Sequence, residues 1–268
     1  MDSKISPLFI KRIKNLLHDS LDVKKFFDFA SFAPKKSIRC NTLKISPINL
    51  KKRLECDYGW RVSQPFKEFP EIMIIDSQLL PGELGKTKEH LLGLFYVQEI
   101  TSMMPILALM PNEGEVFLDL CAAPGSKTSF ASALMNNKGT VFANDVNLSR
   151  TSILCANLER VGSTNAIVTK HNGVEFCNKA VKLGLFFDKI LVDAPCSGEG
   201  NLRTSKKTLH KWSEKLLFSL SKKQKNILLN AFLCLKPGGL LVYSTCSYAP
   251  EENELVVQAL LDKFKDSV

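Results

Sequence analysis

Two cysteines lie in short motifs whose neighbouring residues suit covalent chemistry. Cys196 belongs to DAPCSGEG (193–200) and Cys246 belongs to STCSYAPEENE (244–254). A thiolate can add to an electron-poor ring carbon, such as carbon 6 of cytosine, and so make carbon 5 nucleophilic. Asp193 could then act as the general acid for the ring nitrogen. These residue types allow either cysteine to be the nucleophile, although a single cysteine is often only a small buried side chain.

A third motif, DLCAAPGSKT (119–128), has the small residues of a ligand-binding turn. Small side chains let the backbone approach a ligand, and Lys127 adds positive charge that could also lower the pKa of a nucleophilic thiol. A phosphate-binding P-loop needs glycines where this motif has Cys121 and Ser126. We therefore expect an adenosine-containing cofactor, whose ribose hydroxyls would donate hydrogen bonds to Asp145 at the end of the next predicted strand.

The three motifs follow strands of a predicted parallel sheet. From about residue 91, β-rich runs alternate with helix-length segments, which is typical of an α/β fold with helices on both faces of a mostly parallel sheet. Ligands bind outside the carboxyl ends of such strands, so the motifs should lie at one edge of the sheet. The predicted strands are 115–120, 139–145, 166–171, 187–195 and 239–246, and the predicted helices are 98–109, 126–136, 149–161, 213–235 and 250–265.

Residues 1–90 are predicted to form a small, basic α+β unit, and residues 91–268 are predicted to form the catalytic domain. The first 90 residues contain 17 Lys and Arg against 11 Asp and Glu, within a chain of net charge +9. Such an excess favours polyanions, including RNA, as partners. Helix starts are predicted at Ser6-Pro7 and Ser46-Pro47, and extended segments at 37–45, 60–64 and 71–76.

Composition excludes several other classes of protein. The chain has 45% hydrophobic residues but no apolar run of the roughly 18 residues needed to cross a bilayer. We therefore expect no signal peptide and no membrane anchor, and a cytoplasmic location. The eight cysteines are too far apart for C-x-x-C zinc pairs and too few for a disulfide scaffold in 268 residues. Reduced thiols and no metal site are therefore expected.

Together with SIRCNTLK (37–44) and YVQEITSMMP (96–105), the motifs resemble the RNA cytosine-5 methyltransferases of the Sun/Fmu type, from about residue 37 to 262. The resemblance implies a Rossmann-like methyltransferase fold, S-adenosylmethionine as cofactor, and ribosomal or transfer RNA as substrate. It implies that Cys246 attacks the base and that Cys196 assists product release. Asp193 and Lys127 are the other catalytic candidates, for the chemical reasons given above. The implied cofactor-binding residues are Cys121, Ala122, Ala123, Pro124, Gly125, Ser126, Lys127, Asp145, Arg150, Asn172 and Asp193.

The resemblance also implies that the amino-terminal unit binds RNA. Arg39, Asn41 and Lys44 are its expected contacts near the active site. A second basic segment, 203–225, is either a rim that contacts RNA phosphates, through Lys206 and Lys207 among others, or a solvated helix face.

Three departures from the family pattern stand out. Asn172 replaces a usual Asp, which removes a charge but keeps an acceptor for the adenine amino group. Ser126 replaces a common Gly. Family members normally continue past the last helix with two more strands, so strand 239–246 is expected to form an exposed edge that a partner or a second copy could cover.

Two rival functions remain. One is DNA methylation, although DNA cytosine methyltransferases use the cysteine of the earlier motif and carry a long target-recognition insert. The other is a non-catalytic RNA-binding or ribosome-assembly factor, which Asn172 and the absent final strands favour. The two intact cysteine motifs count against this second alternative, because a protein that only binds RNA gains little from two exposed thiols.

Overall fold

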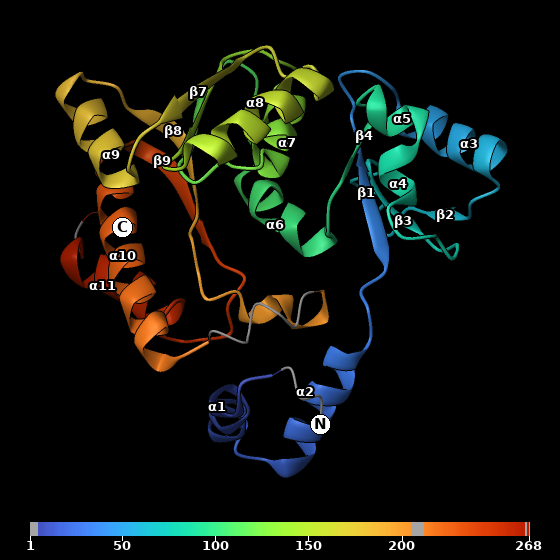
Figure 1. Cartoon of the computed structure of the whole chain (residues 1–268). Coiled ribbons are helices and arrows are strands. Elements are labelled where there is room, and N and C mark those ends of the chain that lie inside the picture. Colours follow the sequence, from blue (N-terminus) through green and yellow to red (C-terminus); the bar gives the residue numbers. More distant parts are fainter. Residues whose placement is uncertain (1–4, 205–211, 266, 268) are drawn as a thin grey trace. The chain divides into compact units, whose positions relative to one another are not determined.

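The computed structural model describes residues 5–204, 212–265 and 267, which Figure 1 colours along the sequence. The chain divides into two units. The first unit comprises Met1–Pro34, Ala194–Leu229 and Tyr243–Val268. The second unit comprises Lys35–Asp193 and Asn230–Val242. No helix among the described residues is both long enough and apolar enough to cross a bilayer.

A five-stranded sheet of order β7-β6-β5-β8-β9 positions the predicted cofactor motif. The β5–β6, β6–β7 and β5–β8 pairs are parallel; Leu118 of β5, for example, lies in register with Phe142 on one side and Ile190 on the other. The chain thus builds outward from β5 in both directions, which creates a topological switch point between β5 and β8. β9 forms one edge of the described sheet. The strands are β5 (Val116–Asp119), β6 (Thr140–Asp145), β7 (Ala166–Lys170), β8 (Phe187–Asp193) and β9 (Leu235–Ser244).

Helices cover both faces of this sheet because its side chains alternate in direction. Val141 of β6 packs in one core cluster with Phe130 of α7, whereas Phe142 points the other way. The Phe142 ring lies 6.4 Å from that of Phe176 in α9 and 5.5 Å from that of Phe187. The helices of this layer are α6 (Ile100–Leu109), α7 (Ser126–Leu134), α8 (Leu148–Val161) and α9 (Gly173–Lys182). The predicted α/β fold is confirmed, but α9 was not among the predicted helices.

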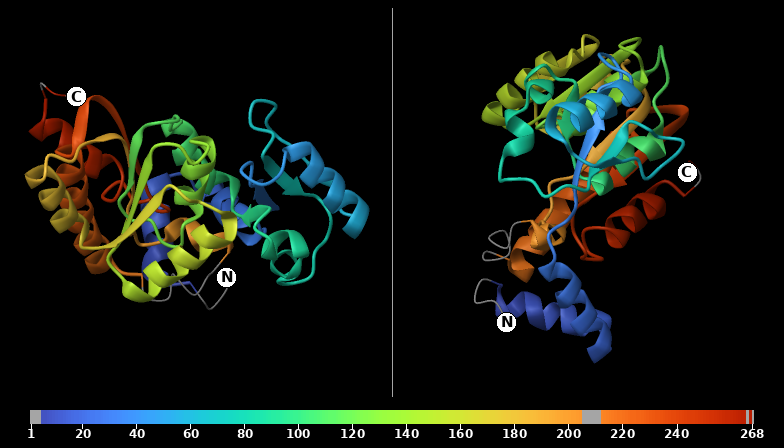
Figure 2. Two further views of the ribbon diagram at one scale, coloured as in Figure 1. Left: turned by 90° about the horizontal axis from the view of Figure 1, so that it is seen from above. Right: turned by 90° about the vertical axis from the view of Figure 1, so that its right-hand side faces the viewer.

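A second, antiparallel sheet of order β2-β3-β1-β4 belongs to the same unit and is drawn in blue and cyan beside the green strands (Figure 2). Its own core includes Leu50, Leu54, Trp60, Met73 and Phe95. Its elements are β1 (Lys36–Cys40), β2 (Val62–Ser63), β3 (Ile72–Ile75), β4 (Phe95–Val97), α3 (Pro47–Tyr58), α4 (Glu83–Lys86) and α5 (Lys88–Leu91). The helix predicted after Ser46-Pro47 is confirmed, since the Ser46 side chain accepts the Asn49 N–H.

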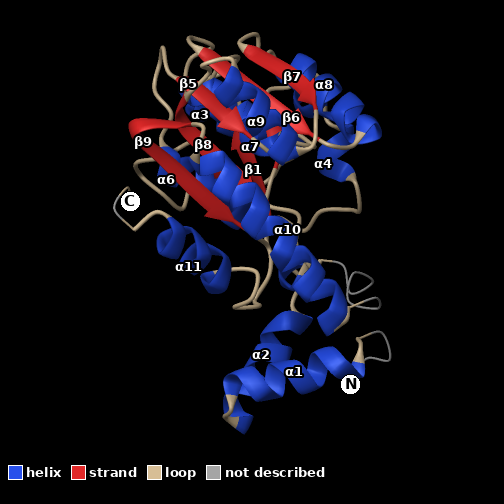
Figure 3. Cartoon of the chain, turned by 90° about the vertical axis from the view of Figure 1, so that its left-hand side faces the viewer, coloured by secondary structure: helices blue, strands red, loops and turns tan. Residues whose placement is uncertain are grey.

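The first unit is built from helices and loops (Figure 3). Its core joins Phe9 and Ile13 of α1 to Trp212 and Leu217, and the Phe9 and Trp212 rings meet edge to face at 5.6 Å. The predicted helix after Ser6 is therefore present. Its elements are α1 (Pro7–Leu17), α2 (Ser20–Ser31), the 3₁₀ helix η1 (Glu199–Arg203), most of α10 (Glu214–Phe232) and α11 (Glu254–Lys263).

Candidate active site

Three carboxylates end the strands beside the switch point of the large sheet. Asp119 ends β5, Asp145 ends β6 and Asp193 ends β8, so parallel pairing brings them to the same edge. Asp119 and Asp145 are almost fully buried, whereas Asp193 is partly exposed. Carboxylates at this edge face the place where ligands of doubly wound sheets bind.

The predicted cofactor motif forms a tight turn between β5 and α7. The Ala122 N–H donates to the Asn144 carbonyl at 2.8 Å, which ties the turn to the end of β6. Gly125 precedes α7 with a φ of 101°, and a Cβ there would lie 2.8 Å from Leu154 Cδ1. Only glycine satisfies both the left-handed backbone and the close approach. The turn therefore presents small side chains and backbone groups at the sheet edge.

Lys127, in the first turn of α7, lies against the carboxylate that ends β8. Its ammonium is 2.7 Å from Asp193 Oδ2 and donates a second hydrogen bond to Ser102 Oγ at 3.2 Å. The lysine side chain is 13% exposed and that of Asp193 is 33% exposed, so solvent only partly screens the pair. The structure therefore brings these two predicted catalytic residues together as an ion pair.

Asp145 is held by groups of its own unit. One oxygen accepts the Asn147 N–H at 3.0 Å, and the other lies 3.3 Å from both the Ala123 N–H and Arg150 Nη1. Arg150 also donates to the Ala123 carbonyl, so it links the acid to the turn. A carboxylate offers about four acceptor positions, and these contacts leave capacity for ribose hydroxyls.

Asn172, the residue that departs from the family pattern, is exposed and precedes α9. Its side-chain oxygen accepts the Val174 N–H at 3.0 Å and thereby caps that helix. If Asn172 also accepts a hydrogen bond from the adenine amino group, as predicted from the sequence, its side-chain oxygen would accept from both that amino group and the Val174 N–H.

Burial changes the titration of two groups at this edge. It raises the pKa of Asp119 to about 7, although the Thr128 hydroxyl donates to this carboxylate at 2.7 Å and opposes the rise. The other oxygen of Asp119 is buried and has no hydrogen-bond partner among the described residues. Burial also raises the pKa of the Cys121 thiol, and the carboxylates of Asp119, Asp193 and Asp145 raise it further. Cys121 therefore stays protonated and is unsuited to nucleophilic attack.

The two predicted catalytic cysteines meet in the first unit. Cys196 Sγ lies 3.1 Å from Cys246 Sγ, and the Cys246 N–H donates to Cys196 Sγ at 3.3 Å. All eight cysteines of the chain are within the described residues and are thiols. The predicted convergence of these two side chains is thus present, whereas Lys127 and Asp193 belong to the second unit.

The two sulfur atoms differ in environment. Cys246 is exposed and Cys196 is partly buried. The hydrogen bond with Cys246 raises the pKa of Cys196, and burial raises it further. Cys196 therefore keeps its proton, and its S–H can donate a hydrogen bond to Cys246 Sγ. Cys246 Sγ also accepts a hydrogen bond from Asn201 Nδ2 at 3.7 Å.

Two predicted RNA contacts are wrong because the side chains are buried. Arg39 is 2% exposed and donates to the Ser126 carbonyl, and Asn41 is 5% exposed and donates to two backbone carbonyls. Lys44 is exposed, but its ammonium donates to the carbonyls of Leu92 and Arg160. These residues join parts of the second unit. Lys206 and Lys207, the predicted phosphate contacts, lie outside the described residues.

Sequence reasoning missed two acids beside the thiols. Glu199 and Glu252 are 1% and 0% exposed, and each accepts several hydrogen bonds in the first unit. Both belong to the cysteine motifs, where an acid among small and polar residues could have been recognised as a candidate. Their burial was not predictable from residue type, because glutamate is almost never fully buried unless it is paired.

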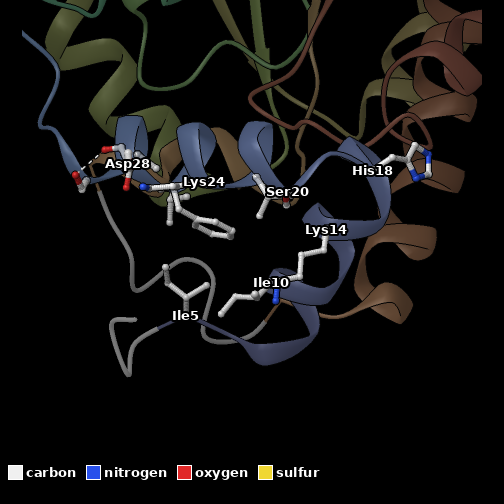
Figure 4. A pocket seen from close by; sticks show the side chains of 12 residues that line it. Ile5, Ile10, Lys14, His18, Ser20, Lys24 and Asp28 are labelled. Carbon is white, nitrogen blue, oxygen red and sulfur yellow. Dashed lines mark hydrogen bonds between the residues drawn. The ribbon is translucent and has the colours of Figure 1, made fainter.

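A cavity of about 820 Å³ lies between α1 and α2 in the first unit. Ile10 and Lys14 of α1 border it, together with Lys24 and Asp28 of α2 (Figure 4). Its lining contains neither the thiols nor any other predicted site residue. This cavity is therefore separate from the residues that carry the chemistry.

The doubly wound sheet, the small-residue turn and the acids at the strand ends define a Rossmann-like methyltransferase fold. Residues 106–268 match the family described as 16S rRNA methyltransferase RsmB/F, and residues 5–100 match the N-terminal domain of 16S rRNA methyltransferase RsmF. The chain belongs to the RsmB/F family. The predicted Sun/Fmu-type resemblance is confirmed, and membership of this methyltransferase family supports S-adenosylmethionine as the cofactor.

Relatives in two bacteria are named ribosomal RNA small subunit methyltransferase F. That of Vibrio parahaemolyticus is 40% identical over 267 residues, which cover 98% of this chain and 55% of the relative. That of Aeromonas hydrophila is 41% identical over 261 residues, covering 96% and 54%. The chain therefore spans about half the length of the curated relatives it matches.

Solved structures show the same fold. A methyltransferase homolog protein from Pyrococcus horikoshii has a TM-score of 0.76 and 35% identity, with 97% of this chain and 84% of that chain covered. NSun6 from the same organism, crystallised with SFG, has a TM-score of 0.82 and 24% identity, with 95% and 86% covered. At that identity the second likeness establishes the fold alone.

Proposed function

We propose that this chain transfers a methyl group from S-adenosylmethionine to carbon 5 of a cytosine in 16S rRNA, with Cys246 as the covalent nucleophile. The observation that carries the proposal is the pair of thiols 3.1 Å apart, of which Cys246 is exposed. Membership of a 16S rRNA methyltransferase family supports the choice of RNA. Such a substrate would place the enzyme in the cytoplasm.

The chemistry of the sheet edge fits S-adenosylmethionine. The cofactor's ribose, amino and ammonium groups are hydrogen-bond donors, and this edge supplies carboxylate acceptors. One of them, Asp119, has a buried oxygen that no described residue hydrogen-bonds. When bound, the cofactor supplies a methyl group on a positively charged sulfur. We assign the ribose to Asp145, oriented by Arg150, and the adenine amino group to Asn172. The turn from Cys121 to Lys127, with Ala122, Ala123, Pro124, Gly125 and Ser126, would contact the cofactor through its backbone.

The thiol environment supports Cys246 as the attacking group. Its sulfur accepts a hydrogen bond from Asn201 and can accept another from the S–H that Cys196 retains, and both hydrogen bonds stabilise a thiolate. Addition of this thiolate to carbon 6 of the cytosine forms a carbon–sulfur bond and moves an electron pair toward carbon 5. After methylation, a base removes the proton from carbon 5, the ring double bond re-forms, and the bond to Cys246 breaks. We assign the assistance of this release to Cys196.

Asp193 is our candidate for the proton donor to the cytosine ring nitrogen. It ends β8, and Cys196 follows it by three residues. A chain of that length spans at most about 11 Å even when fully extended, so the covalent connection keeps the acid near the thiol segment. Lys127, 2.7 Å from this carboxylate, would hold its side chain in place and supply the proton that the carboxylate passes to the ring nitrogen.

Single cysteine variants test the assignment. We expect Cys246→Ala to lose methylation of 16S rRNA completely, because no covalent adduct can form. We expect Cys196→Ala to accumulate a protein–RNA adduct that survives denaturing electrophoresis, because release is blocked. Cys56→Ala, which changes an exposed cysteine of α3, is the control and should behave as wild type.

The readouts are transfer of tritiated methyl groups and bisulfite sequencing of the RNA. Normal turnover in Cys246→Ala, with loss of turnover and no adduct in Cys196→Ala, would reverse the two roles. Methylation of duplex DNA but not of RNA would contradict the substrate. Failure to bind S-adenosylmethionine at millimolar concentration would instead support a non-catalytic RNA-binding factor.

A further inference from the structure

Glu199 lies in the segment that contains Cys196 (193–200), but its side chain is hydrogen-bonded to the segment that contains Cys246 (244–254). These two stretches are called the Cys196 segment and the Cys246 segment. Glu199 follows Cys196 by three residues, yet its carboxylate accepts the Tyr248 N–H at 3.0 Å and the Ser247 hydroxyl at 3.3 Å. The Trp212 indole N–H donates to its other oxygen at 2.7 Å. The side chain is 1% exposed, so these contacts replace water as its hydrogen-bonding environment.

Glu252 makes the opposite connection. It follows Cys246 by six residues, and its carboxylate accepts both the N–H and the hydroxyl of Ser197, the residue after Cys196, at 3.0 and 2.5 Å. Gln224 of α10 donates to it at 2.9 Å. The Glu252 side chain is 0% exposed. Each cysteine segment therefore contributes one buried carboxylate that is hydrogen-bonded to the other segment.

Two further contacts close the gap between the segments. The hydroxyls of Ser197 and Ser247, the residues that directly follow the two cysteines, lie 3.1 Å apart. The Gly200 N–H donates to the Cys246 carbonyl at 2.7 Å, and a Cβ at Gly200 would approach that oxygen to 2.9 Å. The backbones therefore approach as closely as a glycine permits, and the sulfur atoms follow at 3.1 Å.

The burial of Glu199 and Glu252 is better explained by a role in positioning the two cysteine segments than by a contribution to the stability of the fold. Removing a carboxylate from water is costly unless its lone pairs are filled, and apolar residues of similar volume usually pack at lower cost. The donors to Glu199 and Glu252 named above are neutral groups with fixed directions. Such a network specifies where the joined backbone segments lie, because each donor must point at its oxygen.

We propose that Glu199 and Glu252 are positioning residues for the reaction, which hold the Cys196 and Cys246 sulfur atoms within hydrogen-bonding distance of each other. This inference rests on the proposed function, in which both thiols act on one base. Neither acid touches the base in this proposal. Each acts through the backbone and serine contacts of the opposite cysteine segment.

The test measures thiol proximity and turnover separately, in the full chain. Dibromobimane becomes fluorescent when it bridges two neighbouring thiols, and peptide mapping shows whether the bridge joins Cys196 to Cys246. In Glu199→Gln and Glu252→Gln, the amide places an N–H opposite a donor, so we expect bridging to slow about tenfold. The kcat should fall by a similar factor, with the KM for RNA within about twofold of wild type, because the RNA contacts are unchanged.

Glu251→Gln is the matched control. Glu251 precedes Glu252 in sequence but forms an ion pair with Arg12 of α1, so bridging and kcat should match wild type. If the glutamine variants fail to fold, Ser197→Ala tests the proposal instead. This variant removes the hydroxyl that donates to Glu252, so bridging of the two thiols should slow by less than the tenfold expected for the glutamine variants.

Folded variants that bridge the two thiols at the wild-type rate would overturn the positioning role. An equal loss of bridging in Glu251→Gln would also overturn it, because the effect would then not be specific to these two acids. If the wild-type chain bridges the thiols but methylates no RNA, the proposed function fails while the effect of the carboxylates on thiol distance is still measured.

Discussion

Replacing Asp119 by Asn should remove a loss of stability that the wild-type chain suffers as the pH rises. The carboxylate is 1% exposed, and burial raises its pKa to about 7. In the unfolded chain an aspartate has a pKa of about 3.9. The folded state therefore binds this proton more tightly than the unfolded state does. The stabilisation of the folded state by the bound proton is fully present below about pH 4 and disappears as the pH rises through about 7.

The magnitude follows from the difference of about three pKa units, which corresponds to roughly 4 kcal/mol over the whole window. Between about pH 5 and pH 8, Asp119 should lower the free energy of unfolding by about 3 kcal/mol, because two of the three units lie in that interval. The Asn variant keeps an acceptor for the Thr128 hydroxyl and cannot titrate. Any cost of its buried amide is the same at both pH values.

Urea titrations at the two pH values, followed by circular dichroism, measure the effect as a difference between wild type and Asp119→Asn. Asp145→Asn is the control for loss of a buried carboxylate, since Asp145 is equally buried but paired with Arg150. Equal pH dependence in wild type and Asp119→Asn would refute the reasoning, because the carboxylate would then not bind its proton more tightly in the folded state.

Two further changes test the cofactor edge. Asp145→Asn should weaken S-adenosylmethionine binding about tenfold in isothermal titration calorimetry, because it removes one charged acceptor and the Arg150 ion pair; unchanged affinity would argue against a ribose contact. Gly125→Ala should destabilise the chain by about 1–3 kcal/mol, because the backbone is left-handed and Leu154 occupies the space of the new methyl group. Its melting temperature should fall below that of Gly184→Ala, which has a similar backbone but open space; equal melting temperatures would reject the steric part of this argument.

The sequence predicted the large sheet well because each strand is a short apolar run that ends in a polar motif. Because the strands are parallel, the motifs that follow them lie at the same edge of the sheet. The positions of the cofactor turn and of the acids could therefore be predicted as well. Helix α9 was missed although Asn172 caps it and its apolar positions, Phe176, Cys177 and Ala180, recur at helical spacing; the sequence therefore carried a signal for this helix. Helix α2 was missed although Asp19 caps it, because its aromatic residues are spread around the helix and one of them, Phe29, is exposed.

The environment of charged side chains was much harder to predict than their position along the chain. Arg39 was predicted to contact RNA because of the family resemblance, which does not tell whether the side chain is exposed. Whether such a side chain is buried depends on the element packed against the strand, and that element is distant in sequence. The same limit applies to Glu199 and Glu252, because each accepts hydrogen bonds from the opposite cysteine motif, about 50 residues away in the chain.

The buried position of Arg39 has a consequence for dividing this protein into fragments. Arg39 comes from the segment that matches the RsmF N-terminal domain, yet it donates to the Ser126 carbonyl at 2.6 Å and the Ser129 hydroxyl at 2.7 Å, and lies 4.6 Å from the Phe130 ring centre. These partners belong to α7, in the segment that matches RsmB/F. A fragment that begins after residue 100 would leave them without their donor, and a chimera would need an arginine at the same strand position. The two segments are separable as sequence families, but in the folded chain a cation of one segment completes the packing of the other.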